Sequence, residues 1–81
     1  MTEKSPVAHE LNARRMLCPM PVIKTQDKIK TLLPGALLKV YCTDPGVEAD
    51  IPAWCRINGH KVLHIEKQAL EICLTIEVGN Q

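Results

Sequence analysis

Residues 18–35 carry the sequence CPMPVIKTQDKIKTLLPG, which predicts a helix with prolines at its start and just after its end. Pro19 and Pro21 suit a helix start, because the first backbone N–H groups of a helix have no partner inside it anyway. The following residues recur at helical spacing, and Pro34-Gly35 is a strong stop signal. The expected inward-facing stripe is Val22, Thr25, Ile29, Leu32 and Leu33. We therefore expect the helix to run up to Pro34.

Alternating apolar and polar residues predict strands on both sides of this helix. The alternation covers residues 7–12 before the helix, 38–42 after it, and 62–65 and 72–78 near the C-terminus. A period of two is typical of strands with one buried face. Within 62–65, it would place Leu63 and Ile65 on one face.

A second helix is predicted between the second and third strands. Val47, Ile51, Trp54 and Cys55 fall on one helical face. Pro52 conflicts with a long helix, since a proline deep inside removes a hydrogen bond and collides with the preceding turn. We therefore expect a turn at Asp44, then a main helix capped by Asp50, with Pro52 in its first turn. Asn58-Gly59 would end this helix.

The order of the predicted elements indicates the fold class. It is βαβαββ, which favours an α/β two-layer sandwich: a four-stranded mixed sheet with two helices on one face. If the first two strands are adjacent they should be parallel, and the last two should form an antiparallel hairpin. We expect a single domain over residues 7–79 and a flexible tail over residues 1–6. An 81-residue chain leaves no room for a second domain.

Composition and charge exclude several functions. Lys plus Arg number 10 and Asp plus Glu 9, which argues against a nucleic-acid or anionic-membrane surface. The only aromatic residues are Tyr41 and Trp54, too few for a platform that stacks bases. The N-terminus lacks the apolar run of a signal peptide, and no stretch nears the roughly 20 apolar residues of a membrane helix. We expect a cytoplasmic location.

The spacing of the cysteines argues against a metal site. The four cysteines are Cys18, Cys42, Cys55 and Cys73. No two of them stand two to four residues apart, as structural zinc sites prefer. His60 and His64 would lie about 13 Å apart along a strand, too far to share an ion. A reducing cytosol also disfavours permanent disulfides. We expect no metal and no cofactor.

Three of these cysteines favour a structural role, as small buried side chains. Cys42 shares its predicted face with the apolar residues of its strand, and Cys55 lies on the helical stripe. Cys73 is less certain, because it alternates away from Ile72 and Leu74 and so could face solvent.

Cys18 is the thiol with a chemical reason for its position. It directly precedes the predicted first helix, whose partly positive N-terminus favours a thiolate. The prolines remove two of the N–H donors that an anion would use, and Met20 keeps one. We therefore infer a modestly lowered pKa, which suits a sulfur that attacks and then leaves. On this pattern alone, a reactive thiol and a buried structural cysteine are about equally supported.

The same stretch resembles a known protein family. Residues 11–14 and Cys18-Pro19-Met20-Pro21-Val22 look like the signature of the TusA (SirA/YedF-like) sulfur-carrier family, whose core is Cys-Pro-x-Pro. The likeness covers about residues 9–78 and continues through Gly35, Thr43-Asp44-Pro45-Gly46, Asp50-Ile51-Pro52, Trp54-Cys55-Arg56 and Gly59-His60. Family members usually carry Asp where this chain has Asn12, and Gly where it has Arg15. The family fold is a two-layer α/β sandwich of the same order.

The resemblance implies a sulfur relay. Cys18 would accept a sulfane sulfur as a persulfide from a cysteine desulfurase or rhodanese-like donor and pass it to a thiol-bearing acceptor protein. It implies a sulfurtransferase-type carrier, and whether the chain acts as an enzyme stays open. Family members are linked to tRNA thiolation, molybdenum cofactor supply and sulfur metabolism. We expect a monomer that contacts proteins, not nucleic acid or membrane. The alternative is a non-carrier regulatory or protein-binding module of the same fold.

Residues around Cys18 have weaker predicted roles. Pro19, Met20 and Pro21 would support the helix start, and Arg14, Arg15 and Lys24 could form a docking patch or a merely solvated surface. Met16 and Met20 could offer an apolar contact surface or belong to the core. His60 could act as a base, but a hydrogen-bonded structural role is favoured.

Overall fold

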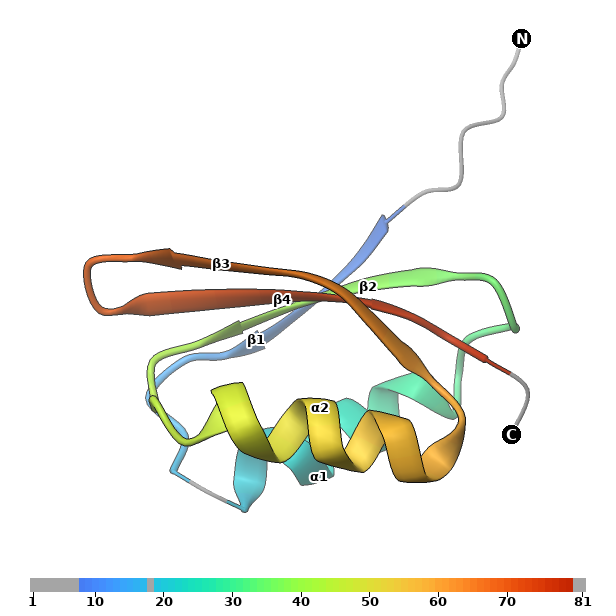
Figure 1. The fold of residues 1–81 in the computed structure, drawn as a ribbon, viewed down its shortest axis with the longest axis horizontal. Helices are drawn as coiled ribbons and strands as arrows, with labels where there is room; N and C mark the ends of the chain where they lie inside the picture. The colour runs from blue at the N-terminus through green and yellow to red at the C-terminus, as the bar shows by residue number, and fades with distance from the viewer. Residues whose placement is uncertain (1–7, 18, 80–81) are drawn as a thin grey trace, which may run out of the picture.

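The computed structural model describes residues 8–17 and 19–79 of the chain. The elements are β1 (Ala8–Ala13), α1 (Met20–Ile29), β2 (Leu37–Cys42), α2 (Val47–Asn58), β3 (Lys61–Gln68) and β4 (Glu71–Glu77). Figure 1 shows both helices beneath one face of the sheet, so the predicted two-layer sandwich is confirmed. The expected tail over residues 1–6 lies outside the described residues.

The sheet is mixed, with strand order β1-β2-β4-β3. β1 pairs with β2 in parallel, and β4 pairs antiparallel with both β2 and β3. The parallel pair and the C-terminal hairpin are therefore confirmed. Ala13, the last residue of β1, lies opposite Cys42, the last residue of β2. The loops that follow these two strands consequently leave the sheet side by side.

The core lies between the sheet and the two helices. The central strands β2 and β4 supply alternate buried residues, as the period of two predicts. The largest contributors are Leu38, Val40, Leu74 and Ile76 from the sheet, with Ile29, Val47 and Ile51 from the helices. Each such side chain contributes about 1.5–3 kcal/mol by leaving water. This burial accounts for the cohesion of the two layers.

α2 begins four residues earlier than predicted. It starts at Val47, with Gly46 as its N-cap, and Pro52 lies inside it as its sixth residue. The expected cap at Asp50, with Pro52 in the first turn, is therefore wrong. Pro52 lacks the N–H that would donate to the carbonyl of Glu48, and an internal proline costs about 3 kcal/mol. Burying both Val47 and Ile51 on the inner face gains about 3–6 kcal/mol, which offsets that loss.

α1 ends earlier than predicted, at Ile29 and not just before Pro34. The chain then tightens into a turn in which the amide of Leu32 donates to the carbonyl of Ile29 at 2.9 Å. Leu33 is 79% exposed, so it does not belong to the inner stripe. Gly35 has a φ of 91° and donates its amide to the carbonyl of Val78 at 2.6 Å. This bond to the end of β4 turns the chain back towards β2.

β3 is an edge strand whose alternation is broken by a bulge. Its register with β4 shifts between Val62 and His64, so Leu63 is the inserted residue. Val62 and Ile65 lie opposite the core residues Ile76 and Leu74, although they are three positions apart. The expectation that Leu63 and Ile65 share a face is therefore wrong. A bulge places two successive residues of one strand against one of the other, and no simple period predicts it.

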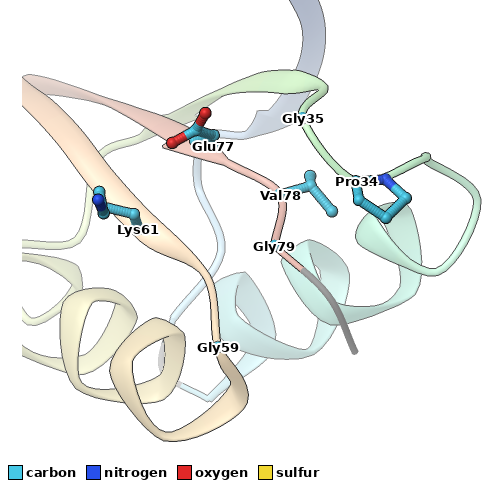
Figure 2. A pocket seen from close by; sticks show the side chains of 7 residues that line it. All are labelled: Pro34, Gly35, Gly59, Lys61, Glu77, Val78 and Gly79. Atoms are coloured by element: carbon cyan, nitrogen blue, oxygen red, sulfur yellow. The ribbon is translucent and has the colours of Figure 1, made fainter.

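The end of β4 is closed against the α2–β3 junction. Figure 2 shows Gly59 and Gly79 on neighbouring segments beside a cavity of about 290 Å³, which Pro34 and Gly35 also line. A Cβ atom on Gly79 would lie 1.9 Å from the carbonyl oxygen of Gly59. The amide of Gly79 donates to Nδ1 of His60 at 3.0 Å. The contact thus requires a residue without a side chain at position 79.

Gly79→Ala tests this close approach. The added methyl group overlaps backbone, so we expect the free energy of unfolding to fall by about 1–3 kcal/mol in urea denaturation. Gly46→Ala is the matched control, because its added Cβ would have no neighbour closer than 3.6 Å. It should change stability by less than about 0.5 kcal/mol. Equal stability of the two variants would contradict this close packing of Gly79 against Gly59.

Candidate functional site

The candidate site lies at the sheet edge where β1 and β2 end. Residues 14–19 join β1 to α1, and the Cys-Pro-Met-Pro sequence, residues 18–21, runs from the end of this loop into the first turn of α1. Cys18 itself lies outside the described residues. Its chain neighbours Leu17 and Pro19 are both exposed. The structure therefore describes the residues that come before and after the candidate thiol in the chain.

The prolines start α1 as predicted. Pro19 is the N-cap, Met20 is the first helical residue and Pro21 is the second. Pro21 is buried, and its carbonyl accepts the hydroxyl of Thr25 at 2.8 Å, which anchors this turn to the core. The amide of Met20 donates to the carbonyl of Leu17 at 2.9 Å. The Met20 amide, which the sequence leaves as a donor for an anion, is thus used within the loop. The helix dipole remains as the general source of positive potential.

A group of exposed apolar residues, the apolar collar, lies at and near the start of α1. It consists of Leu17, Met20 and Ile23, of which Leu17 is 75% exposed. Met16, in contrast, packs against the core. The sequence left open whether the methionines belong to the core or to a contact surface. Met16 belongs to the core, whereas Met20 is exposed and offers a contact surface. Flexible methionine and leucine side chains suit adaptable protein contacts.

Arg15 adopts a backbone conformation that favours glycine. Its φ is 65°, in the left-handed region, and its amide donates to Oγ1 of Thr43 at 2.9 Å. A residue with a side chain pays roughly 1–2 kcal/mol to adopt this conformation. The geometry explains why a glycine suits this position in the resembling family. The Arg15 side chain is exposed, as is Lys24 on the first turns of α1.

Arg14 contacts two residues on the outer face of the sheet. Its guanidinium bonds to the carboxylate of Glu71 and lies 4.7 Å from the ring centroid of Tyr41. The hydrogen bond from Arg14 lowers the pKa of Glu71 and raises that of Arg14. The predicted docking patch consists of Arg14, Arg15 and Lys24. Because Arg14 is paired with Glu71, the exposed charges of the patch are those of Arg15 and Lys24.

Asn12 keeps the acceptor function expected of an aspartate. Its Oδ1 accepts the backbone amide of Arg14 at 3.1 Å and Nη1 of the same residue at 3.3 Å. A carboxylate could accept the same two bonds, with an added charge. Asn12 thus keeps both bonds of the local turn after β1 and lacks only the negative charge of an aspartate.

His60 is not close to the start of α1. It is 7% exposed, stacks on Trp54 at a centroid distance of 5.2 Å, and lines a cavity of about 190 Å³ with Gln26 and Lys30. These last two residues follow Met20 by six and ten positions, roughly 9–15 Å along the helix axis. Burial lowers the pKa of His60. The geometry supports the structural role of His60 over that of a base for Cys18.

The three described cysteines favour the protonated thiol. Burial raises the pKa of Cys42 and of Cys55 to about 11 each. Cys73 is half-buried on the outer face beside Lys39, Tyr41 and Glu66, in a cavity of about 110 Å³. Burial also raises the pKa of Cys73. The structural roles of Cys42 and Cys55 are confirmed, and the outward direction of Cys73 follows from its strand register.

Sequence reasoning missed two contacts of the loop, Arg15 with Thr43 and Arg14 with Glu71. Thr43 had a detectable signal, because a parallel β1–β2 pair brings the residues that follow both strands together. Glu71 had no such signal, since its contact depends on β4 inserting beside β2.

Among residues 8–17 and 19–79, no group of three or more His, Cys, Asp or Glu could hold a metal ion. No helix in those ranges is long and apolar enough to cross a membrane.

Fold and loop together define a class: a small α/β sandwich with a Cys-Pro-x-Pro sequence at the start of its first helix. The family model described as Sulfurtransferase TusA matches residues 9–78. The chain belongs to the TusA family.

Curated relatives agree with this assignment. Sulfur carrier protein TusA of Pseudomonas paraeruginosa is 41% identical over 64 residues, 79% of this chain and 81% of that protein. The protein of the same name from Pseudomonas fluorescens is 40% identical over 67 residues, 83% of this chain and 81% of that protein. YrkF of Bacillus subtilis is 40% identical over 58 residues, which are 72% of this chain but 31% of that longer protein.

The buried His60 predicts a loss of stability in mild acid. Its pKa in the folded protein lies below the ordinary 6.5, so the unfolded chain binds the proton first. Stability should be fully present above about pH 6.5 and should fall as the pH drops from there through the lower native value. Urea midpoints measured across this range check it. His60→Gln should remove this part of the pH dependence, and an unchanged slope in the variant would contradict it.

Arg15→Gly should stabilise the fold. Glycine adopts the positive φ without strain, and its greater freedom in the unfolded chain offsets part of the gain, so we expect up to about 1 kcal/mol. Arg15→Ala is the matched control: it removes the same charge but keeps the strain, and it should leave stability within about 0.5 kcal/mol of the parent. Thermal and urea unfolding measure both. A gain of equal size in the two variants would show that charge, not backbone strain, is responsible.

Proposed function

We propose that this protein is a sulfur carrier that holds sulfane sulfur as a persulfide on Cys18 and passes it to an acceptor protein. The observation that carries the proposal is the TusA-family match over residues 9–78, which includes Cys18-Pro19-Met20-Pro21. Relatives of this length bear the name Sulfur carrier protein TusA. The position of the motif at the start of α1 supports the same role.

The transfer needs no oxidant or reductant. The Cys18 thiolate attacks the terminal sulfur of a donor persulfide, R–S–SH, and a new sulfur–sulfur bond forms as the donor's bond breaks. The products are Cys18–S–SH and the donor thiolate R–S⁻. An acceptor thiolate then attacks the terminal sulfur of Cys18–S–SH, takes it as a persulfide and releases the Cys18 thiolate. The sulfane sulfur keeps its oxidation state in both steps, as in thiol–disulfide exchange.

The other cysteines are poorly suited to this chemistry. A thiol with a pKa of about 11, as in Cys42 and Cys55, holds on the order of one thiolate in ten thousand molecules at pH 7. The raised pKa of Cys73 also disfavours its thiolate. Cys18 is the cysteine that directly precedes the N-cap of α1, Pro19, where positive potential favours the anion.

The surroundings of Cys18 suit protein partners. The apolar collar of Leu17, Met20 and Ile23 is exposed, and so are the cations Arg15 and Lys24, which are close to it in sequence. A partner with an apolar patch and acidic residues at its rim would complement this surface. We propose a cysteine desulfurase or rhodanese-like donor and a thiol-bearing acceptor, in the cytoplasm, where thiols stay reduced. The acceptor would direct the sulfur to tRNA thiolation, to molybdenum cofactor supply or to sulfur metabolism, the three ends that the family resemblance implies.

Persulfide loading tests the proposal. After incubation with glutathione persulfide, intact-protein mass spectrometry should show one added sulfur atom on the parent protein and none on Cys18→Ser. Cys73→Ser is the matched control, because it removes another thiol outside the core, and it should load like the parent. Loading that persists in Cys18→Ser would overturn the assignment. A parent that never loads, yet retains partner proteins equally well as Cys18→Ala, would instead support the non-carrier binding module.

A further inference from the structure

We propose that Thr43 is a positioning residue for sulfur transfer. Its hydroxyl oxygen holds the backbone of Arg15 and thereby sets the geometry of the loop that carries Cys18. This inference rests on the proposed sulfur-carrier function. It assigns to the β2–α2 loop a role in orienting a reaction that takes place on the neighbouring loop.

The first observation is the backbone at Arg15. A φ of 65° is costly for a residue with a side chain, so the surrounding structure must maintain it. The Arg15 side chain is exposed, and no burial of its own holds it there. The hydrogen bond from its amide to Oγ1 of Thr43, at 2.9 Å, is the contact that fixes this backbone position.

The second observation is where this bond comes from. Thr43 lies 28 residues after Arg15 and follows β2 directly, just as Arg14 follows β1. The parallel register sets Ala13 opposite Cys42, so the hydroxyl of the next residue reaches the neighbouring loop. The contact is thus built from the rigid end of the sheet, which is a better reference point than the loop itself.

The third observation is that both flanks of Cys18 are anchored. On one side the amide of Arg15 is held by Thr43. On the other, the carbonyl of Pro19 accepts the amide of Ile23 at 3.1 Å. A third bond joins the two sides, because the carbonyl of Leu17 accepts the amide of Met20 at 2.9 Å. Arg15 is only three residues before Cys18. A displacement of the Arg15 backbone would therefore be passed to Cys18 along a short segment of chain.

These contacts matter for transfer because attack on a persulfide is directional. The incoming sulfur must approach along the sulfur–sulfur bond that breaks, and a docked donor protein restricts the approach further. A displacement of about 1 Å can cost on the order of a hundredfold in rate. A small, freely diffusing reagent is far less sensitive, since it can approach the thiol from any open direction. Loss of the Thr43 tether should therefore separate the two kinds of reaction.

Thr43→Val removes the oxygen while keeping the shape of the side chain, and Thr43→Ser restores the oxygen. The donor is a rhodanese-type sulfurtransferase charged with sulfane sulfur from thiosulfate, and the small probe is iodoacetamide. We expect Thr43→Val to slow loading of Cys18 from the protein donor about tenfold. Thr43→Ser should stay within about twofold of the parent. The iodoacetamide rate and its pH midpoint should be alike in all three, because Thr43 binds backbone and not sulfur.

The outcomes separate the inference from the function on which it rests. A parent that loads at Cys18 while Thr43→Val loads equally fast overturns the positioning role alone. An equal fall in the donor and iodoacetamide rates also overturns it, because the thiol itself would then have changed. A parent that loads neither from the rhodanese nor from glutathione persulfide overturns both proposals.

Hydrogen exchange provides a second measurement on the same variants. The Arg15 amide should exchange faster in Thr43→Val than in Thr43→Ser. Equal exchange in the two variants would show that the tether does not hold this backbone, and would overturn the inference. If Thr43→Val does not fold, Thr43→Ala removes the same oxygen and takes its place in both measurements.

Discussion

The parallel pairing of β1 with β2 is the constraint on which the site depends. A parallel pair requires a crossover, which α1 supplies, and it brings the carboxyl ends of both strands to one edge of the sheet. The loop after β1 and the loop after β2 therefore meet, although 28 residues separate Arg15 from Thr43. Insertion of β4 beside β2 then places Glu71 within reach of Arg14. The contacts of Arg14 and Arg15 with residues distant in sequence follow from this arrangement of three strands.

Packing against the sheet overrides local preference in both helices. Pro52 remains inside α2 because the inner face of that helix buries Val47 and Ile51 against the strands. α1 stops at Ile29 because the chain must turn and reach the bond between Gly35 and Val78. The cost of a missing helical hydrogen bond or a shortened helix is a few kcal/mol at most, and the buried apolar side chains supply more than that.

The cysteines show how position gives one residue type different properties. Cys42 and Cys55 lie in the core, where burial disfavours the thiolate and makes them inert packing groups. Cys73 belongs to the polar outer face of the same sheet. Cys18 precedes a helix start bordered by exposed apolar side chains, the setting that the sulfur-carrier proposal requires. A count of thiols carries none of this information, whereas strand period and helix position carry most of it.

The sequence by itself determined the order of the elements, the mixed sheet, the buried face of β2 and β4, and the helix that starts at the Cys-Pro-Met-Pro sequence. These features depend on near neighbours along the chain, through side-chain period and the geometry of proline. Only the tertiary structure decided the bulge at Leu63, the hydrogen bond from the amide of Gly79 to His60, and the hydrogen bond from the amide of Arg15 to Thr43. Each of these joins residues distant in sequence or depends on how one strand meets another, and such contacts exist only after the layers have packed.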